Sequence, residues 1–290
     1  MKSGFFLIDK PVDITSFDII RKLRKITHIK KMGHTGTLDP FATGLMIIAF
    51  GNATRTLSLL EKADKTYLAE MKFGIKTDTA DLTGNVIAQN DNLPVFNPAS
   101  LSKYVLSIST QIPSKFSAIK IDGKKAYELA RENKSFTMKE KNVKILDFNI
   151  INYSYPILSY KASVSSGTYI RTLSEQIADY CSNIATTISL KRTNINNLSL
   201  EKAVPLNELN EDNWKNYALN YSDLFPDFTI INLPYELENK YLNGMTINSN
   251  QELPNDAKIL VYNADNSICL GFSQSINQQL KPLIIFNNHE

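Results

Sequence analysis

The chain has 290 residues, of which 43% are hydrophobic and 21% charged, a balance typical of a soluble globular protein with one large domain and a small one. It contains no apolar run approaching the roughly 18 residues of a membrane helix, and the apolar run near its start is too short for a signal peptide. The two cysteines, Cys181 and Cys269, lie far apart, so neither a disulfide framework nor a metal site is indicated, and we expect a cytoplasmic protein.

The formal net charge of +3 hides an uneven distribution. Residues 1–200 contain 27 Lys and Arg against 17 Asp and Glu, a net charge of +10, whereas residues 201–290 contain 5 against 12, a net charge of −7. This asymmetry favours a main body that binds a polyanion, followed by a segment of different character. Charge alone is equally compatible with a solvated, lysine-rich surface.

The first predicted elements are a buried strand and a basic helix. The apolar run at residues 4–8 ends at Asp9-Lys10-Pro11, which is typical of a buried strand. Thr15 or Ser16 is expected to cap the helix, with Asp18 in its first turn. We expect its apolar face to consist of Phe17, Ile20, Leu23 and Ile26. The other face and the residues after it are basic, with no acidic residue between positions 19 and 38: Arg21, Lys22, Arg24, Lys25, Lys30 and Lys31.

The middle of the chain alternates between predicted strands and helices. Residues 66–74 have the alternating apolar pattern of a half-buried strand, and a helix is expected from Asn97-Pro98 to about residue 109. Residues 112–144 contain nine Lys and Arg against four acidic residues and retain apolar anchors, so we interpret them as an excursion from the core. Within this excursion, Gly123 to Asn133 is predicted to be helical.

The remaining pattern completes an α+β fold. Strands are predicted at residues 143–151 and 158–166, joined around Tyr155-Pro156, and at 184–193. A helix is expected after Gly167, with Ile170, Leu173, Ile177 and Cys181 at helical spacing. These elements favour a mixed, largely antiparallel central sheet flanked by helices. After about residue 226, short segments separated by Asn, Gly and Pro favour a small β-rich domain, so we predict domains at 1–226 and 227–290.

The densest chemical signal is GHTGTLDPFATG at residues 33–44. Three glycines and a proline predict an irregular loop that brings backbone and short side chains close to a ligand. The loop lacks the residue order of a phosphate-binding loop, and its Asp39 would repel phosphate. On physical grounds, Asp39 either satisfies local N–H groups in a turn or acts as a nucleophile or base.

Five blocks in chain order resemble the TruB family of pseudouridine synthases: GFFLIDKP, GHTGTLDPFATG, DKTY, SKFSAIKIDGKKAYELAR and SSGTYIRTL. The resemblance extends from Gly4 to about Arg192. It implies the pseudouridine-synthase fold and the isomerisation of uridine 55 in the T-loop of tRNA by base flipping. Detaching, rotating and rejoining uracil requires neither a metal nor another cofactor. The resemblance makes Asp39 the nucleophile, which attacks either the ribose or the base.

The resemblance also implies roles for further residues. Arg171 would keep Asp39 ionised and oriented, since burial alone favours the neutral acid. Tyr67 would stack on the base and remove the C5 proton, and His34 would fill the space left by the flipped nucleotide. Tyr169 and Leu190 match further positions that contact the substrate. The alternatives for these residues are ordinary ones: a surface arginine, a packing tyrosine, a polar loop histidine and a core leucine.

The partner implied is the T-arm stem-loop of tRNA. The basic residues expected to follow its phosphates are Arg21, Lys22, Lys30, Lys31, Lys120, Lys124, Lys125 and Arg131. The C-terminal segment vaguely resembles a PUA-like RNA-binding domain, although its charge is acidic. We expect a monomer that needs neither a metal nor a membrane. The alternatives are an RNA chaperone, a pseudouridine synthase acting on another RNA such as rRNA, and a hydrolase with paired carboxylates, for which no acidic residue near Asp39 in sequence supplies a partner.

Overall fold

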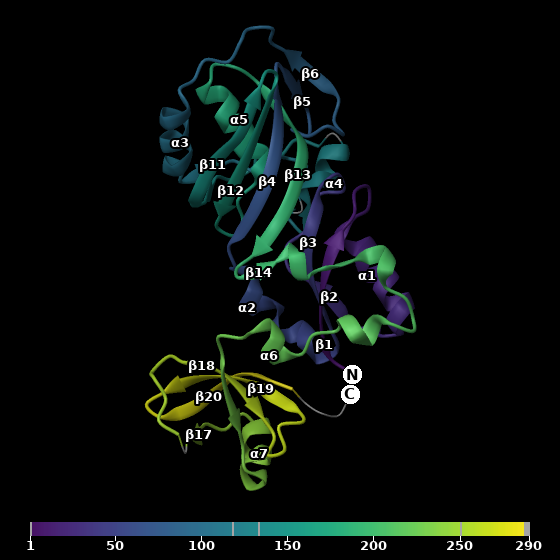
Figure 1. Ribbon diagram of the computed structural model, residues 1–290, viewed down its shortest axis with the longest axis vertical. Coiled ribbons are helices and arrows are strands. Elements are labelled where there is room, and N and C mark those ends of the chain that lie inside the picture. The colour runs from purple at the N-terminus through teal and green to yellow at the C-terminus, as the bar shows by residue number, and fades with distance from the viewer. Residues whose placement is uncertain (1, 118, 133, 250, 287–290) are drawn as a thin grey trace.

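The computed structural model describes residues 2–117, 119–132, 134–249 and 251–286, which form an elongated α+β molecule (Figure 1). A large sheet forms the main body, and a smaller sheet lies at one end. The spatial order of the large sheet is β11 (Ile145–Ser154), β12 (Ile157–Val164), β4 (Lys65–Phe73), β13 (Ala185–Ile195), β3 (Thr43–Phe50), β1 (Gly4–Lys10) and β15 (Val204–Pro205). β2 (Met32–His34) also pairs with β3, and β14 (Leu198–Ser199) pairs with β13.

The large sheet is mixed and largely antiparallel, as the sequence predicted. β3 pairs in parallel with β13, and β1 pairs in parallel with β15, while β11, β12, β4 and β13 follow one another antiparallel. The predicted hairpin around Tyr155-Pro156 joins β11 to β12. The alternation predicted for residues 66–74 is confirmed, because Tyr67, Ala69 and Met71 are buried in β4 while Glu70 is exposed.

The part of the sheet that contains β1 is covered on both faces, which explains the uninterrupted apolar run at the start of the chain. In β1, Phe6 and Ile8 pack in one hydrophobic cluster, with the helices of the main body. Phe5 and Leu7 pack in a second cluster on the opposite face. A strand that is buried on both faces needs apolar side chains at every position rather than at alternate ones.

Helix α1 (Ser16–Thr27) begins with a capping box, in which the Thr15 side chain accepts from the backbone of Asp18 and the Asp18 carboxylate accepts from the backbone of Thr15. The predicted apolar face is right for Ile20, Leu23 and Ile26 but wrong for Phe17, which is 52% exposed. Phe17 lies about 100° around the helix from Ser16. The small polar Ser16 points inwards at this end, so the aromatic ring is left outside.

Two further helices cover the other end of the main body. α3 (Pro98–Ser107) and α5 (Ile170–Tyr180) lie over β11, β12 and β4 (Figure 1). Both confirm predicted helices. The remaining helices are short: η1 (Gly51–Thr56), α2 (Leu57–Glu61), α4 (Ala126–Arg131), η2 (Leu200–Lys202), η3 (Leu206–Glu208), η4 (Trp214–Tyr217), α6 (Tyr221–Leu224) and α7 (Tyr235–Leu242).

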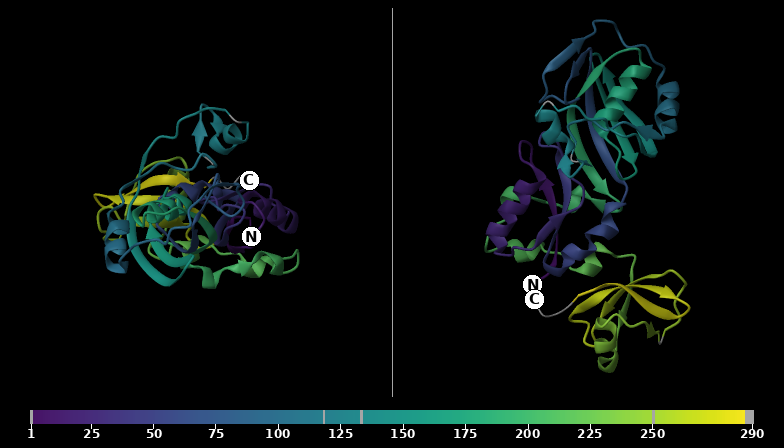
Figure 2. Two further views of the ribbon diagram at one scale, coloured as in Figure 1. Left: turned by 90° about the horizontal axis from the view of Figure 1, so that it is seen from above. Right: turned by 180° about the vertical axis from the view of Figure 1, so that it is seen from behind.

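The excursion predicted at residues 112–144 leaves the main body and returns to it at the same place. β7 (Thr110–Gln111) pairs with β10 (Lys141–Asn142) at its base, and in the left view of Figure 2 the segment carrying α4 stands away from the main body. The helix predicted from Gly123 is shorter, because β8 (Lys120–Ile121) and β9 (Lys124–Lys125) form a turn there and α4 comprises Ala126–Arg131. Position 133 lies outside the described residues.

The smaller sheet is built from the C-terminal part of the chain. Its spatial order is β16 (Thr229–Asn232), β18 (Lys258–Tyr262), β19 (Cys269–Ile276), β20 (Gln279–Ile285) and β17 (Ile247–Asn248). Phe272 of β19 packs edge-on against Tyr221 and Phe225, and both of these rings contact Phe5 of β1. This aromatic cluster therefore connects the smaller sheet, which lies at one end of the molecule (Figure 2, right), to β1 of the large sheet.

No helix in the described ranges is long and apolar enough to cross a membrane.

A hairpin formed by β5 (Ile75–Thr77) and β6 (Val86–Gln89) extends from the end of β4. The turn between its strands lies against α5 and β13 through contacts of Asp81. This hairpin brings a polar turn of the chain to the site described next.

Candidate active site

The predicted irregular loop lies between β2 and β3, and buried Arg192 binds both of its ends. Arg192 of β13 donates from Nε to the Leu45 carbonyl at 2.7 Å and from Nη2 to the Gly36 carbonyl at 3.1 Å. Gly44 has a φ of +105°, and a Cβ there would lie 2.3 Å from the Arg192 carbonyl oxygen. Close backbone approach therefore requires glycine at this position.

Two more side chains hold the middle of the loop. The Ser16 hydroxyl accepts from the Leu38 amide at 2.9 Å and donates to the Leu38 carbonyl at 3.2 Å. Lys10, at the end of β1, donates to the carbonyls of Pro40 at 3.1 Å and Ala42 at 2.7 Å. Asp39, which lies between Leu38 and Pro40, is thus held in place by contacts with α1 and β1, and these contacts restrict the direction of its side chain.

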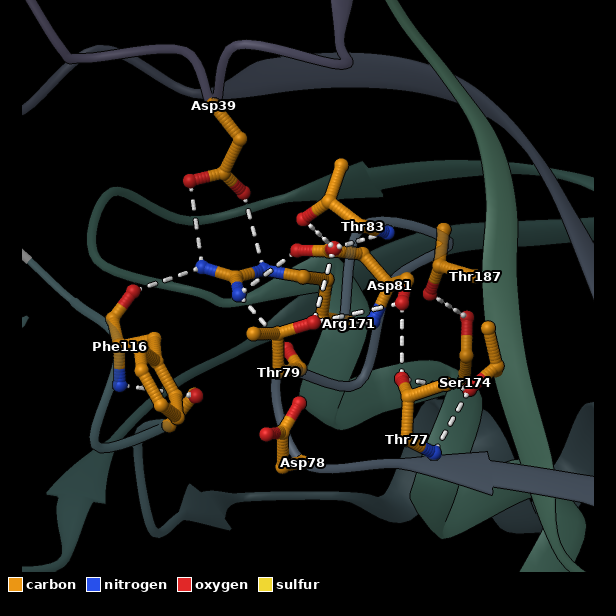
Figure 3. A network of polar contacts seen from close by, with 12 residues as sticks. Asp39, Thr77, Asp78, Thr79, Asp81, Thr83, Phe116, Arg171, Ser174 and Thr187 are labelled. Atoms are coloured by element: carbon orange, nitrogen blue, oxygen red, sulfur yellow. Dashed lines mark hydrogen bonds and ion pairs between the residues drawn. The ribbon is translucent and has the colours of Figure 1, made fainter. Parts of the chain in front are cut away.

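Asp39 pairs with Arg171, as the sequence predicted. Arg171 stands in the first turn of α5, and its Nε lies 2.9 Å from Oδ2 of Asp39 while its Nη2 lies 3.1 Å from Oδ1. Figure 3 shows the two carboxylate oxygens facing one edge of the guanidinium. This two-point geometry fixes both the position and the plane of the carboxylate.

The guanidinium of Arg171 donates four hydrogen bonds and forms one further close ion-pair contact, from Nε to Asp39, with described residues. Besides its two contacts with Asp39, Nη2 donates to the Phe116 carbonyl at 3.1 Å, and Nη1 donates to the Thr79 carbonyl at 2.7 Å and to Oδ2 of Asp81 at 3.1 Å (Figure 3). The Arg171 side chain is 5% exposed, which excludes the surface-arginine alternative. A guanidinium held by these contacts cannot rotate without breaking several of them, so it presents a fixed edge to Asp39.

Asp81 is a second acidic partner of Arg171, and the sequence did not reveal it. Its Oδ1 accepts from the hydroxyl of Thr79 at 2.9 Å, the amide of Thr83 at 2.9 Å and the hydroxyl of Thr83 at 2.6 Å. Its side chain is 5% exposed, compared with 32% for Asp39. Asp81 is therefore enclosed and orients Arg171, whereas Asp39 remains accessible to a ligand.

Burial dominates the electrostatics of Asp39. Burial raises the pKa of Asp39 above its ordinary value, the Arg171 guanidinium opposes this rise, and the negative charge of Asp81 adds to it. Burial also lowers the pKa of nearby Lys10 to about 8, against the opposing charge of Asp39. Asp39 is thus a carboxylate held in a partly dry site by a cation, which makes it more reactive than a hydrated one.

The structure places the other predicted residues on β4, on β13 and just before α5. Tyr67 and Leu190 are buried on the neighbouring strands β4 and β13, and Tyr67 is in register with Arg192. No hydrogen bond joins the Tyr67 hydroxyl to Asp39 in the described part of the chain. Tyr169 immediately precedes α5, where its backbone amide donates to the Gln111 side chain at 2.9 Å.

His34 ends β2 close to two cations. Burial, followed by the charges of Arg192 and Lys125, lowers its pKa below the ordinary value. Its buried Nδ1 has no hydrogen-bond partner among the described residues. These surroundings favour a neutral imidazole at physiological pH.

The predicted RNA-backbone residues occupy two separate regions. Arg21 and Lys22 lie on α1, and Lys30 and Lys31 follow that helix. Lys22 also lines a surface hollow of about 480 Å³ together with Lys10 and Lys191. The others lie in the excursion: Lys120, Lys124, Lys125 and Arg131.

Sequence reasoning did not identify Asp81, Lys10, Arg192 or Ser16. Lys10 and Arg192 lie within or at the end of predicted strands, at residues 4–11 and 189–193, where nothing marks them as part of a site. Thr79, Asp81 and Thr83 have the alternating short polar residues of an ordinary hydrogen-bonded turn. Among the described residues, no group of three or more His, Cys, Asp and Glu side chains could hold a metal ion.

Comparisons with known proteins identify the family of the chain. The family described as "TruB family pseudouridylate synthase (N terminal domain)" matches residues 24–170. The "tRNA pseudouridine synthase B" of Clostridium novyi (strain NT) is 33% identical over 288 residues, which cover 98% of this chain and 100% of the relative. The protein of the same name from Fusobacterium nucleatum is 41% identical over 204 residues, covering 68% of this chain and 69% of the relative.

Solved structures support the fold. A chain in the "Crystal Structure of a Cbf5-Nop10-Gar1 Complex" superposes with a TM-score of 0.71 at 17% sequence identity, covering 99% of this chain and 84% of that one. At this identity, the likeness concerns the fold. Together with the family match and the relatives, which are similar over most of their length, it leads to one conclusion. The chain belongs to the TruB family of pseudouridylate synthases.

Proposed function

We propose that this protein isomerises uridine 55 in the T-loop of tRNA to pseudouridine, with Asp39 as its nucleophile. The observation that carries the proposal is the two-point pair between Asp39 and Arg171, at 2.9 and 3.1 Å, on a loop fixed from three other elements. The curated relatives named tRNA pseudouridine synthase B support tRNA as the substrate. The basic surfaces on α1 and on the excursion fit a phosphate backbone.

The chemistry balances without an external reactant. Asp39 attacks the flipped uridine, at the ribose or at the base, while the bond from ribose C1′ to uracil N1 breaks. The uracil rotates, a bond forms between C1′ and C5, and Asp39 is released. The proton on C5 leaves, with Tyr67 as the candidate base, and N1 gains a proton. The substrate and product have the same atoms and oxidation state.

The site is built to control charge during these steps. Arg171 keeps Asp39 ionised against the effect of burial and holds both of its oxygens, so the carboxylate needs no reorganisation before it attacks. The neutral form of His34 favoured by its surroundings suits an aromatic ring that fills the place of the extruded nucleotide. Tyr169 and Leu190 line the site as substrate contacts.

The decisive experiment maps pseudouridine in tRNA before and after incubation with the purified protein. Unmodified tRNA transcripts and rRNA fragments are incubated in parallel with the protein and with Asp39→Asn, and modified positions are identified by mass spectrometry. New pseudouridine at position 55 of tRNA, absent with Asp39→Asn, supports the proposal. Modification confined to the rRNA fragments would show that the substrate is rRNA rather than tRNA. RNA binding without any modification would favour an RNA chaperone.

A further inference from the structure

Two guanidinium groups lie close to the exposed ring of Phe17. The Cζ of Arg21 lies 5.9 Å from the ring centroid, and the Cζ of Arg24 lies 5.8 Å from it. The ring is 52% exposed at the first turn of α1, where neighbouring Ile19 and Ile20 are buried. An exposed phenyl ring gains nothing from packing there, whereas a flat ring flanked by cations suits a flat, electron-rich ligand.

One of these cations has unused hydrogen-bonding capacity. Arg21 forms an ion pair with Asp18 at 2.8 Å. Arg24 has no hydrogen-bond acceptor or ion-pair partner in the described ranges, and its Nε is buried without one. Because a guanidinium has five donors, Arg24 can bind an anion while its plane stays near the Phe17 ring.

Phe17 is also anchored beside the reactive loop. Its neighbour Ser16 binds both backbone groups of Leu38, the residue before Asp39. The amide of Asp13 donates to the Pro40 carbonyl at 2.9 Å, so the segment leading into α1 touches the loop on the other side of Asp39. A polymer bound at Asp39 therefore passes close to this end of α1.

We propose that Phe17, Arg21 and Arg24 form a stacking site for one unpaired nucleotide of the RNA substrate, near the nucleotide that reacts at Asp39. The base stacks on the ring and the guanidinium planes, and its phosphate binds Arg24. No acidic residue occurs between positions 19 and 38, so this surface favours a polyanion over a cationic or apolar partner. The ligand class rests on the proposed function, because it takes the substrate to be RNA.

The same arrangement recurs in the other basic region. Tyr127 of α4 lies under two cations, with Lys125 Nζ at 5.4 Å and Arg131 Cζ at 5.6 Å from its ring centroid. Both regions thus combine an aromatic ring with two cations, which is the combination that binds single-stranded nucleic acid. A lysine-rich surface that served solubility alone would not need the rings.

The test measures the affinity of the full-length protein for a T-arm hairpin. Phe17→Ala should weaken binding roughly 5- to 150-fold, the range for loss of one base–aromatic stack, while Phe17→Trp should bind like the wild type. Arg24→Gln should weaken binding and reduce the slope of log K against log salt by about one. Tyr235→Ala is the matched control, because Tyr235 is 79% exposed on the C-terminal part of the chain.

An abasic scan identifies the nucleotide. Each unpaired position of the hairpin is made abasic in turn, and binding is measured for the wild type and for Phe17→Ala. At one position the abasic change should weaken wild-type binding but add nothing to Phe17→Ala.

Two results would overturn the inference. If Phe17→Ala binds the hairpin within twofold of the wild type, the ring does not stack. If it weakens binding but no abasic position couples to it, the ring acts on something other than a base. Either result leaves the proposed function standing when the wild type still forms pseudouridine. Conversely, if the wild-type protein forms no pseudouridine, the proposed function is refuted, whatever the result of the abasic scan.

Discussion

Arg171 and Asp81 lie 3.1 Å apart, Nη1 to Oδ2, although 90 residues separate them in the chain. Asp81 thus holds one end of the guanidinium whose other edge holds Asp39. The two residues act on Asp39 with opposite sign, because Arg171 lowers its pKa and Asp81 raises it. The proposed role of Asp39 as nucleophile requires its ionised form, so we expect activity to fall as the pH falls through its pKa. Variants of the two neighbours should therefore shift this acid limb in opposite directions.

Asp39→Asn should abolish turnover while leaving RNA binding within about threefold of the wild type. The amide cannot act as a nucleophile, and loss of a covalent catalyst lowers rates by several orders of magnitude. Release of label from RNA containing uridine tritiated at C5 measures turnover. Wild-type-like release would remove the nucleophile assignment.

Arg171→Lys should lower kcat about 100-fold or more and move the acid limb of kcat/KM to higher pH. A lysine keeps the charge but cannot bind both oxygens of Asp39 or replace the bonds to Thr79 and Phe116. With the guanidinium bonds gone, burial raises the pKa of Asp39 further. A pH–rate profile measures the shift, and Arg55→Lys, an exposed arginine of η1, is the matched control.

Asp81→Asn should lower kcat about tenfold and move the same limb to lower pH. Removal of the negative charge of Asp81 removes one cause of the raised pKa of Asp39. The loss of rate follows because the amide holds Arg171 less firmly than the carboxylate. Asp91→Asn, on the exposed surface, controls for the substitution itself. A limb that moves upwards would show that Asp81 does not act on Asp39 through its charge.

Gly44→Ala should destabilise the protein by more than about 3 kcal/mol, because overpacking against fixed backbone adds to the cost of a positive φ. The new Cβ would lie 2.3 Å from the Arg192 carbonyl oxygen. Gly167→Ala is the control, since Gly167 has a φ of +87° with nothing within 4 Å of a Cβ. It should cost about 1–2 kcal/mol. Urea denaturation measures both, and equal losses would contradict the predicted clash.

Phe272→Ala should destabilise the whole chain by about 3–5 kcal/mol. Phe272 lies in the smaller sheet but packs against Tyr221 and Phe225, which reach Phe5 of the large sheet. A single cooperative thermal transition at lower temperature is expected. Two separate transitions would indicate that the smaller sheet melts independently.

The order and type of most elements followed from local patterns in the sequence. Strand β4 alternates because one face is better covered than the other, and β1 is uniformly apolar because both faces are covered. Phe17 was misplaced because the periodicity at a helix end is compatible with more than one buried face. Only the hydrogen bonds of Ser16 to Leu38 decide which residue points inwards.

Part of the candidate site could be predicted from the sequence. The pairing of Asp39 with Arg171 came from the resemblance of two sequence blocks rather than from spacing. Asp81 could not be found in this way, since its turn has the residues of any hydrogen-bonded turn. Its place beside Arg171 depends on where the β5–β6 hairpin folds, which is a long-range property. Arg192 and Lys10 were hidden for a similar reason, because their partners are backbone carbonyls, which every sequence contains.

The bond from Arg171 to the Phe116 carbonyl links the reactive carboxylate to the periphery. Phe116 belongs to the excursion that leaves the sheet at β7 and returns at β10. Displacement of this segment takes an acceptor from the guanidinium that neutralises Asp39. A ligand that holds the excursion in place would thereby also hold one acceptor of the guanidinium that pairs with Asp39.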